Sequence, residues 1–210
     1  MIIVYGAFPT RSLRVMWALE ELGIAYEMRP IDLRKRMEDV EFIAINPSGF
    51  LPAMRDGDVT MVDSIAMLEY ILARYGNGRL APAVNDAAFA LYQQFLHLGE
   101  SGLAAYLNVI VASRFLAPEG EKQNFGASAA ERMFFNRLQL VSRQLGRAPM
   151  MAGDIFTAAD ISVIYALGMA ERLGLADKFG QEVADYRSRM AARPAFQRAS
   201  TKWSPPAKPA

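Results

Sequence analysis

The first eighty residues alternate between strand-like and helix-like spacing of apolar positions. Short apolar runs predict strands, and a run with Leu13, Met16 and Trp17 on one side and Glu20 and Glu21 on the other predicts an amphipathic helix. The strand–helix–strand start favours a parallel pair joined by a crossover. The predicted elements in chain order are a strand over 2–6, a helix over 12–22, a strand over 25–32, two short strands over 53–55 and 59–62, and a helix over 65–75.

From residue 86 onward the pattern is helical throughout, with prolines between or beside the helical stretches. We expect a first domain over residues 1–80, an all-helical domain over 86–203, and a disordered Pro-rich tail over 204–210. The predicted helices of the second part cover 87–111, 127–145, 160–173 and 181–191.

The third of these helices begins at a capping box. Thr157 is the expected N-cap, and the Asp160 carboxylate three residues later reaches back to the Thr157 amide. Because this pairing stabilises a helix end, we assign the motif a structural role and no catalytic one.

Composition excludes several kinds of chemistry. The chain of 210 residues has no cysteine and one histidine, so disulfides, thiolate nucleophiles of the protein and multi-histidine metal sites are excluded. The net charge of +1 and the absence of a long basic block argue against nucleic acid or a membrane surface as a partner. No 18-residue apolar run is free of charge, and the chain starts directly with a strand, so we expect a cytoplasmic protein without a membrane helix.

The densest motif is the run Asn46-Pro47-Ser48-Gly49-Phe50-Leu51-Pro52, followed by Asp63-Ser64 at the start of a helix. Two prolines and a glycine in seven residues indicate a rigid loop. The loop, the predicted hairpin and the helix N-terminus lie close together in the sequence. Their backbone N–H and C=O groups could bind a small, extended, charged ligand.

These pieces together resemble a glutathione S-transferase. The resemblance covers nearly the whole chain and rests on residues 14–27, on the run 46–54, on Asp63-Ser64, on the helical second half and on residues 156–160. It implies a thioredoxin-like α/β N-terminal domain followed by an all-α C-terminal domain, a homodimer, and glutathione as co-substrate with no metal. Glutathione would lie along the first domain, and a small hydrophobic electrophile would lie in a cleft between the domains.

The resemblance also assigns ligand contacts. Pro52 would be cis, and the Leu51 backbone would pair with the extended tripeptide as an added strand. At the helix N-terminus Ser64 would bind the γ-glutamyl carboxylate, and Asp63 would bind its ammonium. Many members carry lysine where this chain has Phe50, so Arg11 or the basic residues 34–36 are candidates for the glycine carboxylate of glutathione.

The residue that activates the glutathione thiol stays open between three hydroxyls. The family places a Tyr, Ser or Cys near the end of the first strand, and here Pro9 stands where many members carry serine. Thr10 and Ser12 lie on the loop that enters the first helix, whereas Tyr5 matches the tyrosine of other members. A hydrogen-bond donor aimed at sulfur would lower a thiol pKa that is ordinarily about 8.5.

The leading hypothesis is therefore a glutathione S-transferase that conjugates the glutathione thiolate to a hydrophobic electrophile. A glutathione-dependent isomerase or peroxidase is an alternative. The competing hypothesis of another class is a non-catalytic protein-interaction module with the same fold, since fold alone does not settle function.

Overall fold

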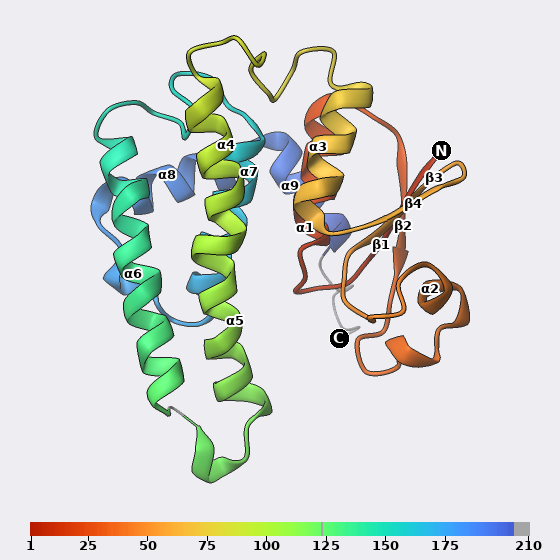
Figure 1. Cartoon of the computed structure of the whole chain (residues 1–210), viewed down its shortest axis with the longest axis horizontal. Coiled ribbons are helices and arrows are strands. Elements are labelled where there is room, and N and C mark those ends of the chain that lie inside the picture. Colours follow the sequence, from red (N-terminus) through yellow and green to blue (C-terminus); the bar gives the residue numbers. More distant parts are fainter. Residues whose placement is uncertain (123, 204–210) are drawn as a thin grey trace, which may run out of the picture. The chain divides into compact units, whose positions relative to one another are not determined.

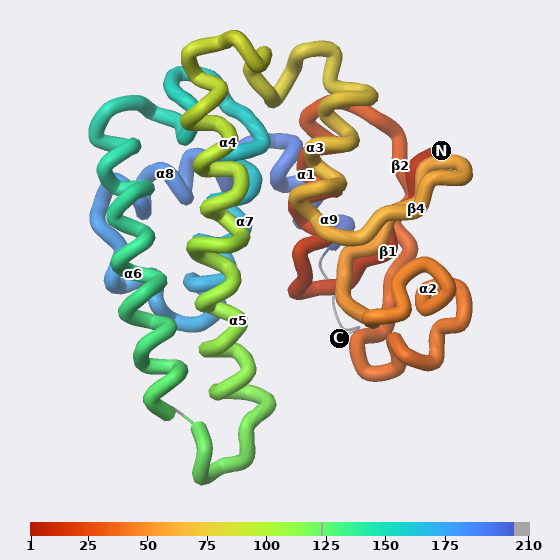
Figure 2. Tube along the Cα trace, viewed as in Figure 1, coloured from red at the N-terminus to blue at the C-terminus, as the bar shows by residue number. Residues whose placement is uncertain are grey.

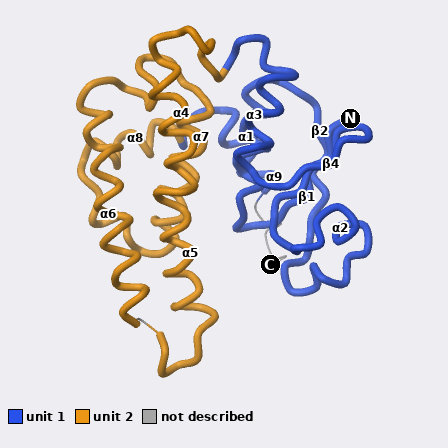
Figure 3. Tube along the Cα trace, in the orientation of Figure 1, with its two compact units in different colours: residues 1–79, 191–210 blue, residues 80–190 orange. Residues whose placement is uncertain are grey.

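The computed structural model describes residues 1–122 and 124–203, and the tail predicted over 204–210 lies outside the described residues. The described chain forms two compact units, one of residues 1–79 and 191–203, the other of residues 80–190 (Figure 3). The sequence, in contrast, predicts a helical domain that continues to residue 203.

Unit 1 contains β1 (Ile2–Gly6), α1 (Ser12–Leu22), β2 (Tyr26–Pro30), α2 (Val40–Ile45), β3 (Ala53–Asp56), β4 (Val59–Val62), α3 (Ser64–Tyr75) and α9 (Pro194–Trp203). Unit 2 contains α4 (Phe89–His97), α5 (Ala105–Val111), α6 (Phe125–Leu145), α7 (Ala158–Arg172) and nearly all of α8 (Gln181–Ala191).

Unit 1 is built on a four-stranded sheet with the order β2-β1-β3-β4 (Figure 1). Strands β1 and β2 are parallel, as the strand–helix–strand order predicts, whereas β3 pairs antiparallel with both β1 and β4. The parallel pair needs a crossover, and α1 supplies it.

The two faces of β1 bury different helices because successive side chains of a strand point to opposite sides. Tyr5 packs with Phe42 of α2, with Ala53 and with Ile31. Helix α2 lies in a segment that the sequence left irregular. Its only fully buried side chain is Phe42, so its apolar pattern is too weak to predict a helix. Asp39 caps it by accepting a hydrogen bond from the Phe42 amide at 3.0 Å.

Helix α1 is buried along most of its length because α3 and α9 both pack against it (Figure 2). The docking of α9 combines an aromatic contact and ion pairs. The rings of Trp17 and Phe196 meet edge to face at 4.8 Å, and Arg193 donates two hydrogen bonds to Glu21, at 2.7 and 2.9 Å. Helix α9 had no counterpart among the predicted helices.

In unit 2 the predicted helix 87–111 corresponds to α4 and α5, joined by the π-helical segment Leu98–Ala104. This segment packs on α7, and Gly99 makes the close approach possible, since a Cβ there would lie 2.4 Å from Ser162 Oγ. The continuous helix Phe89–Leu116 is long and apolar enough to cross a membrane by length and composition. Half of its most apolar window is buried inside the protein, as in a core helix, so the expectation of no membrane partner stays a prediction.

The capping box at α7 is present and extends into a buried network. The Asp160 carboxylate accepts hydrogen bonds from the Thr157 amide at 2.8 Å, the Met151 amide at 2.9 Å and the Tyr186 hydroxyl at 2.6 Å. Burial raises the pKa of Asp160, and these donors oppose that rise. The side chain therefore ties the start of α7 to the preceding loop and to α8.

Replacement of this carboxylate by an amide should destabilise the fold. In Asp160→Asn the new amide nitrogen faces groups that are themselves donors, so we expect the free energy of unfolding to fall by about 3 kcal/mol. Urea unfolding measures it, with Asp154→Asn as the control, because Asp154 is exposed on the same loop. Equal unfolding midpoints for the two variants would contradict the structural role of Asp160.

Candidate functional site

The register of the sheet brings three chain segments to one edge. Ala53, the first residue of β3, pairs with Tyr5 near the end of β1 and with Val62 at the end of β4. The loop after β1, the loop before β3 and the turn into α3 therefore all leave the sheet at the same edge (Figure 1). The segments that the sequence marked as candidates lie in these three places.

The loop before β3 is organised by a buried asparagine. Asn46 Nδ2 donates to the Phe50 carbonyl, and Asn46 Oδ1 accepts from the Ser48 amide at 3.2 Å. The Leu51–Pro52 peptide bond is cis, as predicted for Pro52. Among the described residues, none hydrogen bonds to the amide or the carbonyl of Leu51. These two main-chain groups are therefore available to an extended ligand.

The turn into α3 is made by a strained aspartate. Asp63, rather than Ser64, is the N-cap, and its Oδ1 accepts from the amides of Ile65 at 2.8 Å and Ala66 at 3.0 Å. Its φ of 74° is rare for a residue with a side chain and costs of order 1–3 kcal/mol. Ser64 is the first residue of the helix, so its amide has no acceptor within α3. Asp63 is exposed, with its second carboxylate oxygen outside the cap.

An arginine that the sequence analysis did not single out lies beneath this turn. Arg14 of α1 is fully buried, and its Nη1 donates to Ser64 Oγ at 3.1 Å. Since the Ser64 oxygen accepts from Arg14, the Ser64 hydrogen is left to be donated elsewhere. The signal in the sequence was an arginine between Leu13 and Val15, inside the apolar face of a helix, where a charge is rare without a partner.

Thr10 and Ser12 form a hydroxyl pair at the entrance to α1. Thr10 Oγ1 donates to the Ala7 carbonyl at 2.6 Å and lies 2.9 Å from Ser12 Oγ. Either hydroxyl can be the donor between the two, and Ser12 Oγ also lies 3.5 Å from the Ala7 carbonyl oxygen. Ser12 is fully buried against Gly6, where a Cβ would lie 2.7 Å from Ser12 Cβ. Thr10 is partly exposed, so only Thr10 of the pair can meet a ligand directly.

Tyr5 lies on the face of the sheet that packs against Phe42 of α2. Its hydroxyl donates to Glu41 Oε1 at 2.7 Å, and the Arg29 guanidinium lies 5.2 Å from the centre of its ring. Burial and the hydrogen bond to Glu41 raise the pKa of Tyr5, which makes it a poorer proton donor. This placement favours a packing role for Tyr5 over the catalytic role that the sequence left open.

The remaining candidates flank the site. Arg11 is the N-cap residue of α1 and makes no side-chain cap bond, and Phe50 is 76% exposed beside the cis bond. A second cis bond, Phe8–Pro9, lies in the loop that carries Thr10 and was not predicted.

Comparisons with known proteins point to one family. The family model for the N-terminal domain of glutathione S-transferases matches residues 10–74. The chain is 26% identical to glutathione S-transferase 3 of Schizosaccharomyces pombe, covering 96% of this chain and 88% of the relative. It is also 26% identical to glutathione S-transferase F10 of Arabidopsis thaliana, and this alignment covers 98% of this chain and 99% of the relative.

Solved structures show the same fold at lower identity. A glutathione transferase from Methylococcus capsulatus aligns with a TM-score of 0.84 at 23% identity, covering 96% of this chain and 98% of the other. The transferase URE2P8 of Phanerochaete chrysosporium, solved with oxidized glutathione, aligns with a TM-score of 0.84 at 23% identity. The alignment covers 96% of this chain and 94% of the other. These alignments confirm the predicted architecture of a thioredoxin-like domain followed by a helical one. A family match over residues 10–74 and relatives of one kind along nearly the whole chain support membership of the glutathione S-transferase family.

Proposed function

We propose that this protein is a glutathione transferase that binds reduced glutathione along the edge formed by Leu51, Asp63 and Ser64. The observation that carries the proposal is the convergence at this edge of an unpaired main-chain strand segment, a helix N-terminus and an accessible hydroxyl. Each of the three suits a different part of one peptide ligand.

The main chain and the helix start supply affinity and direction. The cysteinyl part of glutathione pairs with the Leu51 amide and carbonyl, as in the addition of a strand to a sheet. The γ-glutamyl carboxylate meets the Ser64 amide and the Ser64 hydroxyl, whose oxygen Arg14 holds. The free oxygen of Asp63 accepts from the γ-glutamyl ammonium. A carboxylate and an ammonium on one carbon match this pair of neighbouring residues.

The hydroxyl pair supplies the thiol chemistry. Thr10 turns its hydrogen from the Ala7 carbonyl to the glutathione sulfur, and Ser12 donates to Thr10 Oγ1. A hydrogen bond to the thiolate lowers the thiol pKa, and the N-terminus of α1 favours the negative charge further. The thiolate then attacks an electrophile, which is aligned by binding. Ser12 acts through Thr10, because Ser12 is buried.

Binding of a small hydrophobic electrophile, assembly into a homodimer and a cytoplasmic location remain proposals that the resemblance to the family supports. The interaction module without catalysis is the alternative that the first experiment below tests.

Calorimetric titration tests the ligand site. We expect reduced glutathione to bind the wild type saturably and the double variant Asp63→Ala, Ser64→Ala at least tenfold more weakly, because the γ-glutamyl charges lose their partners. The variant Asp58→Ala, on the β3–β4 turn, is the control. No binding by the wild type at millimolar glutathione would contradict the transferase and favour the interaction module.

Arg14 should act on glutathione only through Ser64. We expect Ser64→Ala and Arg14→Met each to weaken glutathione binding several-fold, and the double variant to bind no more weakly than the weaker single one. Circular dichroism first checks that Arg14→Met is folded, with Arg14→Lys as the milder variant. Additive losses in the double variant would show that Arg14 does not work through the Ser64 hydroxyl.

The pKa of bound glutathione distinguishes the three hydroxyls. We expect Thr10→Val to raise the thiol pKa by about one to two units, because one hydrogen bond to a charged group is lost. Ser12→Ala should raise it less, and Tyr5→Phe should leave it unchanged. Ultraviolet titration of the thiolate in the saturated complex measures all three. A larger shift in Tyr5→Phe than in Thr10→Val would overturn the assignment.

A further inference from the structure

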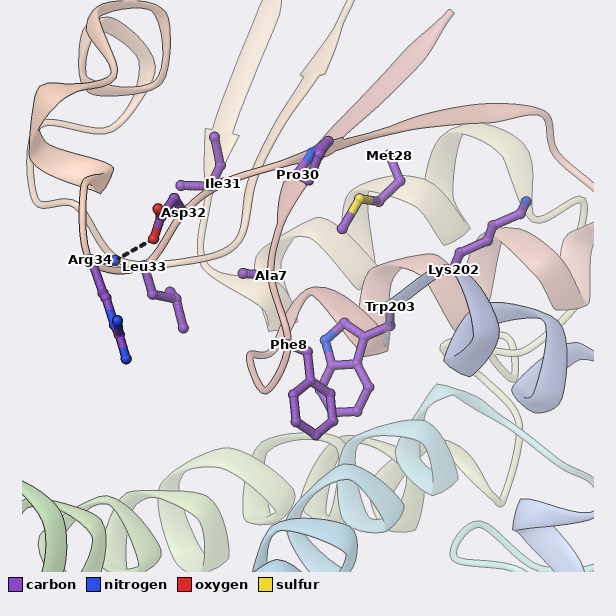
Figure 4. A pocket seen from close by; sticks show the side chains of 10 residues that line it. All are labelled: Ala7, Phe8, Met28, Pro30, Ile31, Asp32, Leu33, Arg34, Lys202 and Trp203. Carbon is purple, nitrogen blue, oxygen red and sulfur yellow. Dashed lines mark hydrogen bonds between the residues drawn. The ribbon is translucent and has the colours of Figure 1, made fainter. Parts of the chain in front are cut away.

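A pocket of about 670 Å³ lies next to the hydroxyl pair, on the side of β2 (Figure 4). All of its walls belong to unit 1. They come from the loop after β1, from β2 and the loop that follows it, and from the end of α9. The volume is in the range of sites for small organic ligands. The side chains that matter most are Phe8, Met28, Ile31, Leu33, Arg34 and Trp203.

The interior of this pocket is apolar and aromatic. The rings of Phe8 and Trp203 meet at 4.6 Å in a nearly edge-to-face contact and form one wall, and Leu33 points into the space beside them (Figure 4). Phe8 is 39% exposed, although it is a large apolar side chain. Aromatic walls with an open face suit a flat apolar ligand.

Three charged residues line the pocket, and two of them are already engaged. Asp32 Oδ1 accepts from the Arg34 amide at 2.9 Å. The Lys202 ammonium donates to Glu20 at 2.7 Å, lies 4.4 Å from the centre of the Tyr26 ring and points away from Phe8 and Trp203 (Figure 4). Among the described residues, no carboxylate lies within ion-pair distance of the Arg34 guanidinium. The Arg34 guanidinium therefore has no ion pair among the described residues, and the Asp32 carboxylate lines the same pocket.

The pocket shares a wall with the proposed thiol site. Ala7 lines the pocket, and the carbonyl of the same residue accepts the Thr10 hydroxyl at 2.6 Å. A sulfur atom beside Thr10 would therefore face a ligand seated against Ala7 and Phe8.

We propose that this pocket takes the acceptor substrate and selects small aromatic carboxylic acids, with the ring against Phe8 and Leu33 and the carboxylate on Arg34. The acceptor role rests on the proposed glutathione transferase function, whereas the binding of acids does not. With a chloronitrobenzoate as acceptor, the thiolate sulfur forms a bond to the ring carbon that carries chlorine. The carbon–chlorine bond breaks, chloride leaves with the electron pair, and the thiol proton goes to solvent.

Binding is tested without glutathione by the fluorescence of Trp203, one of two tryptophans in the chain. The probes are para-chlorobenzoate and para-chlorobenzamide, which have nearly the same shape but differ in charge and in the hydrogen-bond donors of the amide. We expect the acid to bind about fivefold more tightly than the amide, the preference to vanish in Arg34→Ser, and Lys35→Ser to keep it. The signal should disappear in Trp203→Phe. Equal affinities in the wild type, or a preference that survives in Arg34→Ser, would overturn the proposal.

Turnover then separates this proposal from the proposed function. The acceptors are para-chloro-meta-nitrobenzoate and its amide, and Arg34→Ser should raise the KM of the acid about fivefold while leaving the KM of the amide unchanged. No conjugation of either compound, with the acid preference intact in fluorescence, would refute the transferase and support the acid site. Conjugation with equal KM values for acid and amide would refute the acid site alone. If Arg34→Ser weakens glutathione binding by the same factor as it raises the KM of the acid, Arg34 would be assigned to the glycine carboxylate of glutathione, which would overturn the proposal.

Discussion

The double pairing of Ala53 is the constraint on which the candidate site depends. Ala53, the first residue of β3, is paired with Tyr5 of β1 on one side and with Val62 of β4 on the other, which fixes where Pro52 meets the sheet, where β1 ends and where α3 begins. A shift of the register by one residue would turn every side chain of β3 to the opposite face. Because Ala53 and Tyr5 pack under Phe42 in the apolar core, the register is well defined. The ligand-facing loops thus inherit their positions from a buried interaction.

Two buried charged side chains, Arg14 and Asp160, form hydrogen bonds at the N-terminal ends of helices. Arg14 holds the hydroxyl at the start of α3, and Asp160 holds the loop before α7 together with Tyr186 of α8. A buried charge is costly unless it is hydrogen bonded, so each fixes the geometry around it strongly. In unit 1 that geometry lies at the edge of the sheet where we propose that glutathione binds. In unit 2 the Asp160 carboxylate joins the start of α7 to the preceding loop and to α8.

Helix α9 changes the composition of unit 1. Ion pairs to Glu20 and Glu21 and the contact between Trp17 and Phe196 attach it to α1. Its last described residue, Trp203, then completes the wall of the pocket beside Phe8. The far end of the chain therefore contributes to a pocket whose other walls lie within the first 34 residues. Sequence spacing alone gives no indication of such a contact.

The sequence by itself predicted the two-part architecture, the parallel β1–β2 pair and the capping box of Thr157 and Asp160 from local periodicity or from a motif of adjacent residues. The cis bond at Pro52 was implied by the resemblance to the family. The choice between Thr10, Ser12 and Tyr5 as the residue that activates the thiol stays a proposal, and it rests on the tertiary structure alone. All three are hydroxyls near the end of β1, and burial, partner and sheet face distinguish them. The contact of Arg14 with Ser64 spans fifty positions of the chain. The packing of α1 against α3 creates it, and packing is a property of the whole fold.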